Sequence, residues 1–70
     1  MQVQVFRTNI RFKKQLKLVS PHLNSIKGIH RWNIDFQDRD RILRIETELL
    51  PPLAISRTLR EAGFVCDELD

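Results

Sequence analysis

The sequence has a single cysteine, no tyrosine, only two glycines and no long hydrophobic run. Because Cys66 is alone, the chain cannot form an internal disulfide, and such cysteine usage is typical of a reducing compartment. No apolar stretch approaches the roughly 20 residues that span a bilayer. The N-terminus also lacks the basic and apolar regions of a signal peptide. We therefore expect a cytoplasmic protein with no membrane contact.

Catalytic constellations are absent as well. The sequence has no glycine-rich phosphate loop and no paired carboxylates at a defined helical spacing. Its serines (Ser20, Ser25 and Ser56) have no recognisable histidine–acid partners. His22 and His30 lack the spacing of metal ligands, and we interpret both as surface residues. These absences predict a protein that is not an enzyme and has no cofactor.

Length and charge set the remaining limits. Seventy residues form one domain, residues 1–70, near the lower size at which a chain folds alone. Twelve lysines and arginines against nine aspartates and glutamates give a net charge of +3 and a pI near 9.6. This mild excess permits an acidic partner without requiring nucleic acid.

The first half of the chain predicts a strand followed by a helix. Residues 3–10 are rich in β-forming side chains, but Val3 and Val5 have the opposite parity to Phe6, Thr8 and Ile10. Either the strand has a bulge, or one of the two sets lies outside. The next apolar residues are spaced by 4, 3, 4 and 3, which predicts one buried helical stripe made of Phe12, Leu16, Val19, Leu23 and Ile26. Gly28 is expected to end this element.

The second half predicts two strands, a helix and a last strand. Residues 29–36 alternate, with Trp32 and Phe36 on the buried parity, and a charged turn at 37–41 leads to a third strand around Leu43 and Ile45. Pro51-Pro52 opens a helix whose buried stripe is Ile55, Leu59 and Ala62 and which stops at Gly63. Residues 64–69 form the final strand.

This order predicts an α+β, ferredoxin-like βαββαβ sandwich. Right-handed crossovers give an antiparallel sheet in the order 4-1-3-2, with both helices on one face. The loop after the first strand, the 37–41 turn and Gly63-Phe64 are then expected at one end of the sheet. Gly28 and Pro51 are expected at the other end.

The chain resembles the heavy-metal-associated domains, the fold of small copper chaperones. The resemblance rests on the element order, on Gly28-Ile29, on the segment 32–35 (Trp-Asn-Ile-Asp) and on the segment 61–64 (Glu-Ala-Gly-Phe). The family motif Met-x-Cys-x-x-Cys would place Ile10 on the methionine, Phe12 on the first cysteine and Gln15 on the second. Since neither an arene nor an amide is a ligand for a soft metal, the resemblance implies vestigial metal positions at Phe12 and Gln15. We expect Phe12 to point inward and plug the core at this end.

Positive charge gathers around the same loop. Its residues are Arg11, Lys13, Lys14 and Lys17 near the helix start, with Arg39 and Arg41 from the turn. Cations at a helix N-terminus are disfavoured by the helix dipole, so this crowding suggests a docking surface for an acidic protein. The simpler interpretation is a solvated charged face.

The favoured function is therefore a small interaction module without a metal site. Two alternatives stay open. The first is a copper-binding or chaperone protein that either acts as a dimer through Cys66 or binds metal weakly at a degenerate site, although a lone cysteine is more often a small apolar core residue. The second is a nucleic-acid binder that uses the basic residues. We expect Trp32 and Phe36 to face the helices, which argues against RNA stacking on the sheet. The oligomeric state is not determined by the sequence.

Overall fold

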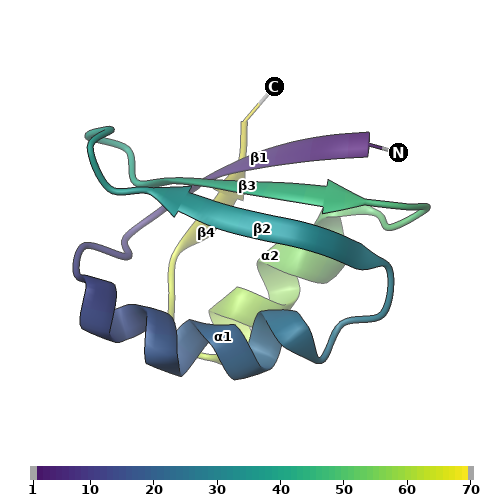
Figure 1. The fold of residues 1–70 in the computed structure, drawn as a ribbon, viewed down its shortest axis with the longest axis horizontal. Helices are drawn as coiled ribbons and strands as arrows, with labels where there is room; N and C mark the ends of the chain where they lie inside the picture. The colour runs from purple at the N-terminus through teal and green to yellow at the C-terminus, as the bar shows by residue number, and fades with distance from the viewer. Residues whose placement is uncertain (1, 70) are drawn as a thin grey trace.

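A four-stranded antiparallel sheet lies on two helices in the computed structural model, which describes residues 2–69 (Figure 1). The elements follow one another as β1 (Gln2–Thr8), the short 3-10 helix η1 (Lys13–Gln15), α1 (Leu16–Asn24), β2 (Ile29–Asp35), β3 (Ile42–Thr47), α2 (Pro52–Glu61) and β4 (Cys66–Glu68). The strand order is β2-β3-β1-β4, which is the predicted order read from the other edge. The predicted fold class is thus confirmed. Met1 and Asp70 of the predicted domain lie outside the described residues.

β1 buries its even-numbered side chains. Gln4, Phe6 and Thr8 are buried, whereas Val3 keeps 63% of its surface exposed. The pairing of β1 with β3 runs without a register shift from Gln2 to Arg7, so the strand has no bulge there. The opposite parities in this segment therefore mean that Val3 and Val5 lie on the outer face of the sheet. The sequence had left this choice open.

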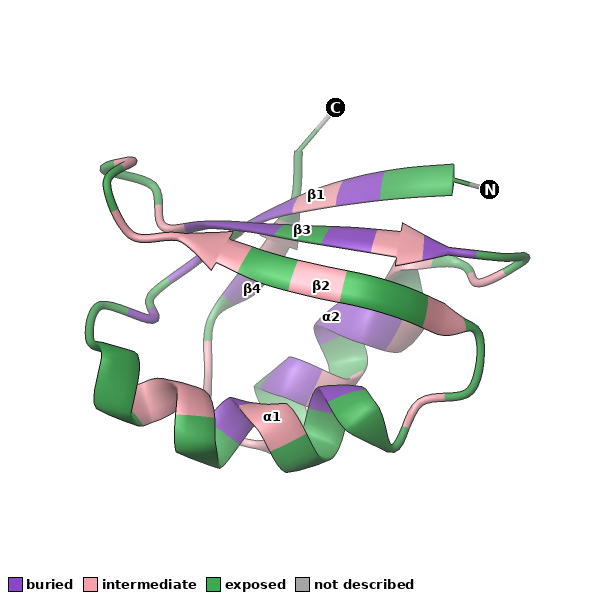
Figure 2. Ribbon diagram, in the orientation of Figure 1, coloured by how far each residue is buried: buried purple, intermediate pink, exposed green. Residues whose placement is uncertain are grey.

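The core lies between the sheet and the helices (Figure 2). Its fully buried residues come from every layer: Phe6, Ile10, Val19, Leu23, Leu43, Ile45, Ile55, Leu59 and Cys66. Leu43 and Ile45 occupy the predicted parity of β3. Trp32, Ile34 and Phe36 pack against the core and are only partly buried, because β2 is an edge strand that the helices cover incompletely. The outer face of the sheet carries polar side chains, including the ion pair Arg31–Glu46 at 3.8 Å.

The first helix begins later than its apolar spacing predicts. Val19 and Leu23 are fully buried and Ile26 packs against the core, as expected. The α-helix, however, runs only from Leu16 to Asn24 and is preceded by the 3-10 turn Lys13–Gln15. Phe12 stands before that turn in an extended conformation. The predicted stripe is therefore correct from Leu16 onward and wrong at Phe12.

The second helix follows its predicted boundaries closely. Pro51 is extended and Pro52 is the first helical residue. Proline is tolerated at this position because the N–H that it lacks has no partner inside the helix. Ile55 and Leu59 are fully buried. Among residues 2–69, no helix is both long enough and apolar enough to cross a membrane.

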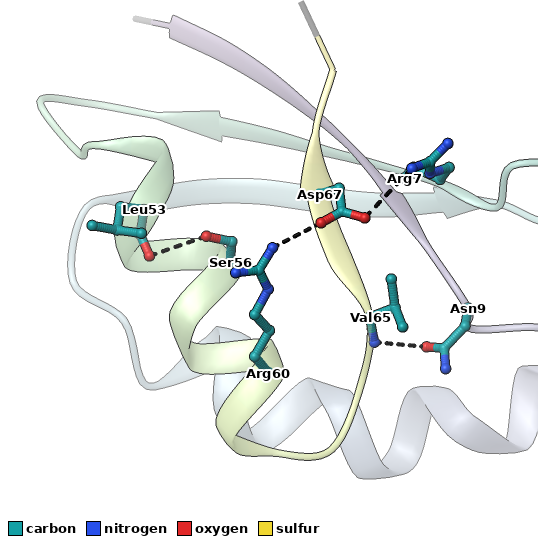
Figure 3. A network of polar contacts seen from close by, with 7 residues as sticks. All are labelled: Arg7, Asn9, Leu53, Ser56, Arg60, Val65 and Asp67. Carbon is teal, nitrogen blue, oxygen red and sulfur yellow. Dashed lines mark hydrogen bonds and ion pairs between the residues drawn. The ribbon is translucent and has the colours of Figure 1, made fainter.

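β4 is shorter than predicted, because only Cys66–Glu68 form strand. Asp67 forms ion pairs with two neighbouring elements: its Oδ1 lies 2.7 Å from the guanidinium of Arg60 in α2, and its Oδ2 lies 3.5 Å from that of Arg7 in β1 (Figure 3). These exposed contacts join the edge strand to the neighbouring strand β1 and to the helix α2 beneath the sheet.

Candidate functional site: the basic end

Three segments meet at the end of the sheet where β1 finishes. The Thr8 N–H donates to the carbonyl of Asp40 at 3.2 Å, and its hydroxyl donates to the carbonyl of Arg41 at 2.7 Å. The side-chain oxygen of Asn9 accepts from the N–H of Val65 at 3.0 Å (Figure 3). The loop after β1, the β2–β3 turn and the segment before β4 therefore gather at one end, as the topology predicted. We call this region the basic end.

Gln15 holds the loop closed. Its amide oxygen accepts from the N–H of Arg11 at 2.7 Å and from the N–H of Phe12 at 2.9 Å. The Gln15 N–H in turn donates to the carbonyl of Phe12 at 2.9 Å. In the motif alignment Gln15 takes the place of the second cysteine. Its oxygen is committed to two backbone donors, so it fixes the loop through hydrogen bonds.

Phe12 does not plug the core, and that prediction is wrong. Its side chain is 58% exposed, and the Lys14 Nζ lies 5.8 Å from its ring centroid. The core at this end is closed by Ile10, which is fully buried. The 3-10 turn has about three residues per turn rather than 3.6, so Phe12 loses the register of the stripe that begins at Leu16. An exposed aromatic ring therefore stands among the lysines.

Five of the six predicted docking residues are exposed: Arg11, Lys13, Lys14, Lys17 and Arg39. Within residues 2–69, none of these five forms an ion pair. Figure 1 shows the β2–β3 turn, which contains Arg39, and the loop after β1 at the same end of the sheet. The turn also contains Asp38 and Asp40, so the positive charge is concentrated on the loop and the helix start.

Arg41 is the exception to the predicted set. Its Nη1 donates to the carbonyl of Phe36 at 2.9 Å and to that of Asp38 at 2.8 Å. Its backbone is left-handed, with φ of 50°. The guanidinium therefore braces its own turn through Nη1, so Arg41 is less available than the other five cations, and its place in the docking surface stays a prediction.

The distribution of charge along the sequence indicates this surface more clearly than the net charge does. The first 34 residues contain no aspartate or glutamate. They carry seven cationic residues: Arg7, Arg11, Lys13, Lys14, Lys17, Lys27 and Arg31. All nine acidic residues follow, from Asp35 onward. Because the loop after β1 falls in this acid-free segment, its cations have no acidic residue near them in the sequence.

Cys66 lies inside the core, as the apolar interpretation predicted. It is fully buried and pairs with Thr8 across the two strands. Burial raises the pKa of its thiol from 9.0 to about 12, although the nearby Arg60 opposes this change and Asp67 adds to it. A thiol that stays protonated and covered is a poor soft-metal ligand.

The other ligand types are dispersed. His30 bonds Glu48 at 3.1 Å toward the opposite end of the sheet, and His22 is exposed on α1. Across residues 2–69, no three histidine, cysteine, aspartate or glutamate side chains come close enough to hold a metal ion. Phe12 and Gln15 likewise present an arene and an occupied amide oxygen, which do not fit copper(I).

Solved structures share this fold, while no protein-family model and no curated protein matches the sequence. The yeast copper transporter domain CCC2A, studied in apo and Cu(I)-loaded states, superposes with a TM-score of 0.84 at 12% identity, covering 100% of this chain and 97% of its own. The Cu(I)-loaded first domain of the human copper chaperone for SOD1 gives a TM-score of 0.77 at 15% identity, over 94% of this chain and 89% of its own.

An apo HMA domain of a copper chaperone for superoxide dismutase gives a TM-score of 0.78 at 15% identity, over 97% of this chain and 66% of that one. This chain has the fold of a heavy-metal-associated domain. Identities this low establish the fold alone, so the expected fold is confirmed. The chemistry of the basic end must be argued from the residues present there.

Proposed function

We propose that this chain is a non-catalytic, metal-independent interaction module that docks an acidic protein through the basic end. The observation that carries the proposal is an exposed aromatic ring, Phe12, surrounded by cations that have no ion-pair partner within residues 2–69. Aromatic residues and arginine are enriched at protein interfaces, and a few such residues carry most of the binding energy. In the proposed complex, the partner's carboxylates face the cations and an apolar pocket receives the ring.

Charge at the helix start supports this proposal. Lys13 and Lys14 lie in the 3-10 turn directly before α1, which has no acidic residue in its first turn. The N-terminal end of a helix carries partial positive charge, so each cation there is unfavourable by about 0.3–1 kcal/mol. Bound carboxylates would relieve this repulsion. The free chain therefore gives up some stability to present a surface of one sign.

The closed loop also favours docking. Because Gln15 ties the backbone of Arg11 and Phe12, these residues are held in place before a partner arrives. A preorganised surface loses less conformational freedom on binding. In this proposal, Gln15 gives the loop the order that a bound metal would otherwise supply. We also propose a cytoplasmic location, because a chain with a single cysteine is typical of a reducing compartment.

The test is a comparison of three proteins as baits in a native extract. Lys13→Glu/Lys14→Glu reverses two charges at the basic end, and Lys27→Glu/Arg44→Glu reverses two exposed charges elsewhere, so both variants have the same net charge. We expect the control to retain an acidic partner and the basic-end variant to lose it. Binding of the purified partner should weaken as salt is added.

Folding must be checked in the same experiment. Since Lys13→Glu/Lys14→Glu removes repulsion from the helix start, it should unfold at a slightly higher temperature than the wild type. Loss of partner from a more stable protein cannot be attributed to misfolding. Equal capture by both variants would refute docking through the basic end, and capture abolished by nuclease would indicate nucleic acid instead.

A soft-metal carrier is the second candidate, because the similar structures include Cu(I)-loaded domains. In this chain such a role would depend on Cys66, whose thiol is covered and has a raised pKa. Titration with copper(I), with and without a thiol-blocking reagent, separates the two functions. Stoichiometric copper binding that the reagent abolishes would replace the metal-independent proposal.

A further inference from the structure

The end of the sheet opposite the basic end carries an unusual leucine. Leu49, in the connection from β3 to α2, has a left-handed backbone with φ of 60°, and its side chain is 92% exposed. The turn itself has a clear purpose, since Leu50 packs against the core and its carbonyl accepts from Gln4 at 2.7 Å. Glycine or asparagine would make this turn more readily. Contacts within the chain therefore explain the turn but not the leucine.

A shallow groove begins two residues later. It is lined by Pro51, Leu53, Ala54 and Arg57 at the start of α2, and Leu53 is itself 58% exposed. Figures 1 and 2 show the β3–α2 connection as an exposed tip at the end of the sheet away from the β2–β3 turn. We call this region, Glu48 to Arg57, the apolar end. It contains both a projecting apolar side chain and a groove that could receive one.

Both signs of charge border this surface. The carboxylate of Glu48, next to Leu49, is 65% exposed and contacts His30 at 3.1 Å. Arg57 borders the groove and forms no ion pair among residues 2–69. A surface that contains a knob, a groove and two opposite charges can be complementary to itself about a two-fold axis. At the basic end, the loop after β1 and the helix start carry only cations, so these two segments would repel their copies.

We propose that the apolar end pairs with the apolar end of a second copy of this chain. Leu49 of each copy enters the groove of the other, and Glu48 of each copy faces Arg57 of the other. The contact consists of Leu49, the groove and one charge pair on each side, which is far fewer than the roughly 20–30 residues a side of a standard interface. The dimer is accordingly weak, with a dissociation constant on the order of 10 μM to 1 mM.

Sedimentation equilibrium of the full chain from 10 μM to 1 mM tests the pairing. Leu49→Asn should weaken the dimer at least tenfold while keeping the fold, because asparagine tolerates the left-handed backbone. The matched control is Leu18→Asn on α1, which removes a side chain that is 62% exposed and should leave dimerisation unchanged.

A charge exchange identifies the occupant as a second copy. Arg57→Glu and Glu48→Arg should each weaken self-association, because each places like charges together twice. An equimolar mixture of the two variants should restore a dimer as tight as the wild type, since both cross-pairs become opposite again. A wild-type chain that stays monomeric at 1 mM, an unaffected Leu49→Asn dimer, or a mixture no tighter than its components would overturn the proposal.

Discussion

The two ends of this sheet present opposite kinds of surface on the same small core. At the basic end, the exposed groups are cations around Phe12, and the backbone is tied down by Thr8, Asn9 and Gln15. At the apolar end, the exposed groups are leucines with charges of both signs. A surface of one sign needs a partner unlike itself, whereas a mixed surface with a knob and a groove can pair with a copy. One 70-residue chain can therefore offer two independent contacts.

Two buried polar residues of β1, one near each end, differ in how fully they are hydrogen-bonded. Thr8 and Gln4 are both 6% exposed on the inner face of β1. The Thr8 hydroxyl is fully used, since it donates to the Arg41 carbonyl and accepts from the Ile10 N–H at 3.2 Å. Gln4 donates to the Leu50 carbonyl, but its own amide oxygen has no hydrogen-bond partner in the described structure. Thr8 is thus the more completely hydrogen-bonded of these two residues, while at the basic end the buried Nε of Arg41 has no hydrogen-bond partner in the described structure.

The largest expected effect is a gain of function at the basic end. Phe12→Cys/Gln15→Cys should bind one copper(I) ion with an affinity many orders of magnitude above that of the wild type, because two thiolates are the ligands this ion prefers. Competition with a copper(I) chelator measures the gain. Since Phe12 is largely exposed, its loss should leave the core intact. Phe12→Ser/Gln15→Ser is the control, and a double-cysteine variant without copper would show that this loop lacks metal-binding geometry.

The next effect concerns the thiol buried behind the basic end. The pKa of Cys66 is about 12 in the folded chain and 9.0 as the ordinary value, so above pH 9 the unfolded state releases a proton that the folded state keeps. Stability should fall as pH rises, by about 1.4 kcal/mol per pH unit from this group. Urea unfolding at pH 9 and 10.5 should show the advantage of the wild type over Cys66→Ala shrinking by about 2 kcal/mol. A constant difference would contradict burial of the thiol.

Smaller effects are expected from substituting the two buried polar residues of β1, Thr8 and Gln4, which can be compared directly. Thr8→Val should reduce the free energy of unfolding by about 1–3 kcal/mol, because the Arg41 carbonyl and the Ile10 N–H lose their partner. Gln4→Met should cost less, about 1 kcal/mol or below, since it also removes a buried oxygen that has no partner. Urea denaturation of both variants provides the comparison. Equal losses would mean that Thr8 and Gln4 are hydrogen-bonded to the same degree.

The smallest effect is expected at Gln15, whose side chain closes the loop after β1. Gln15→Ala should lower the free energy of unfolding by about 0.5–1 kcal/mol, in the range of lost helix caps. It should also speed hydrogen exchange at the amides of Arg11 and Phe12, which donate to Gln15. Gln37→Ala in the β2–β3 turn is the control, because no hydrogen bond of that side chain is seen in residues 2–69. Unchanged exchange at Arg11 would show that the loop is ordered by other contacts.

Some of the basic end could be predicted from the sequence and some could not. The order of elements placed the loop after β1 beside the 37–41 turn, and the hydrogen bonds of Thr8 confirm it. The exposure of Phe12 was not predictable from spacing, because the stripe assumes one helical period where the chain makes a 3-10 turn first. The hydrogen bonds of Arg41 within its own turn were not predictable either, because a charge count cannot tell a guanidinium that faces solvent from one that braces its turn.

The sequence by itself determined the architecture and the missing thiolate pair. Alternation in the strands, the 3–4 spacing in the helices, and the prolines and glycines at their ends are local properties, and together they leave one arrangement of layers. Tertiary structure alone decided which side chains close the core, with Ile10 buried and Phe12 exposed. It also left Leu49 projecting from a left-handed turn. Burial at the end of an element depends on segments distant in the chain, and the pattern within one segment does not contain that information.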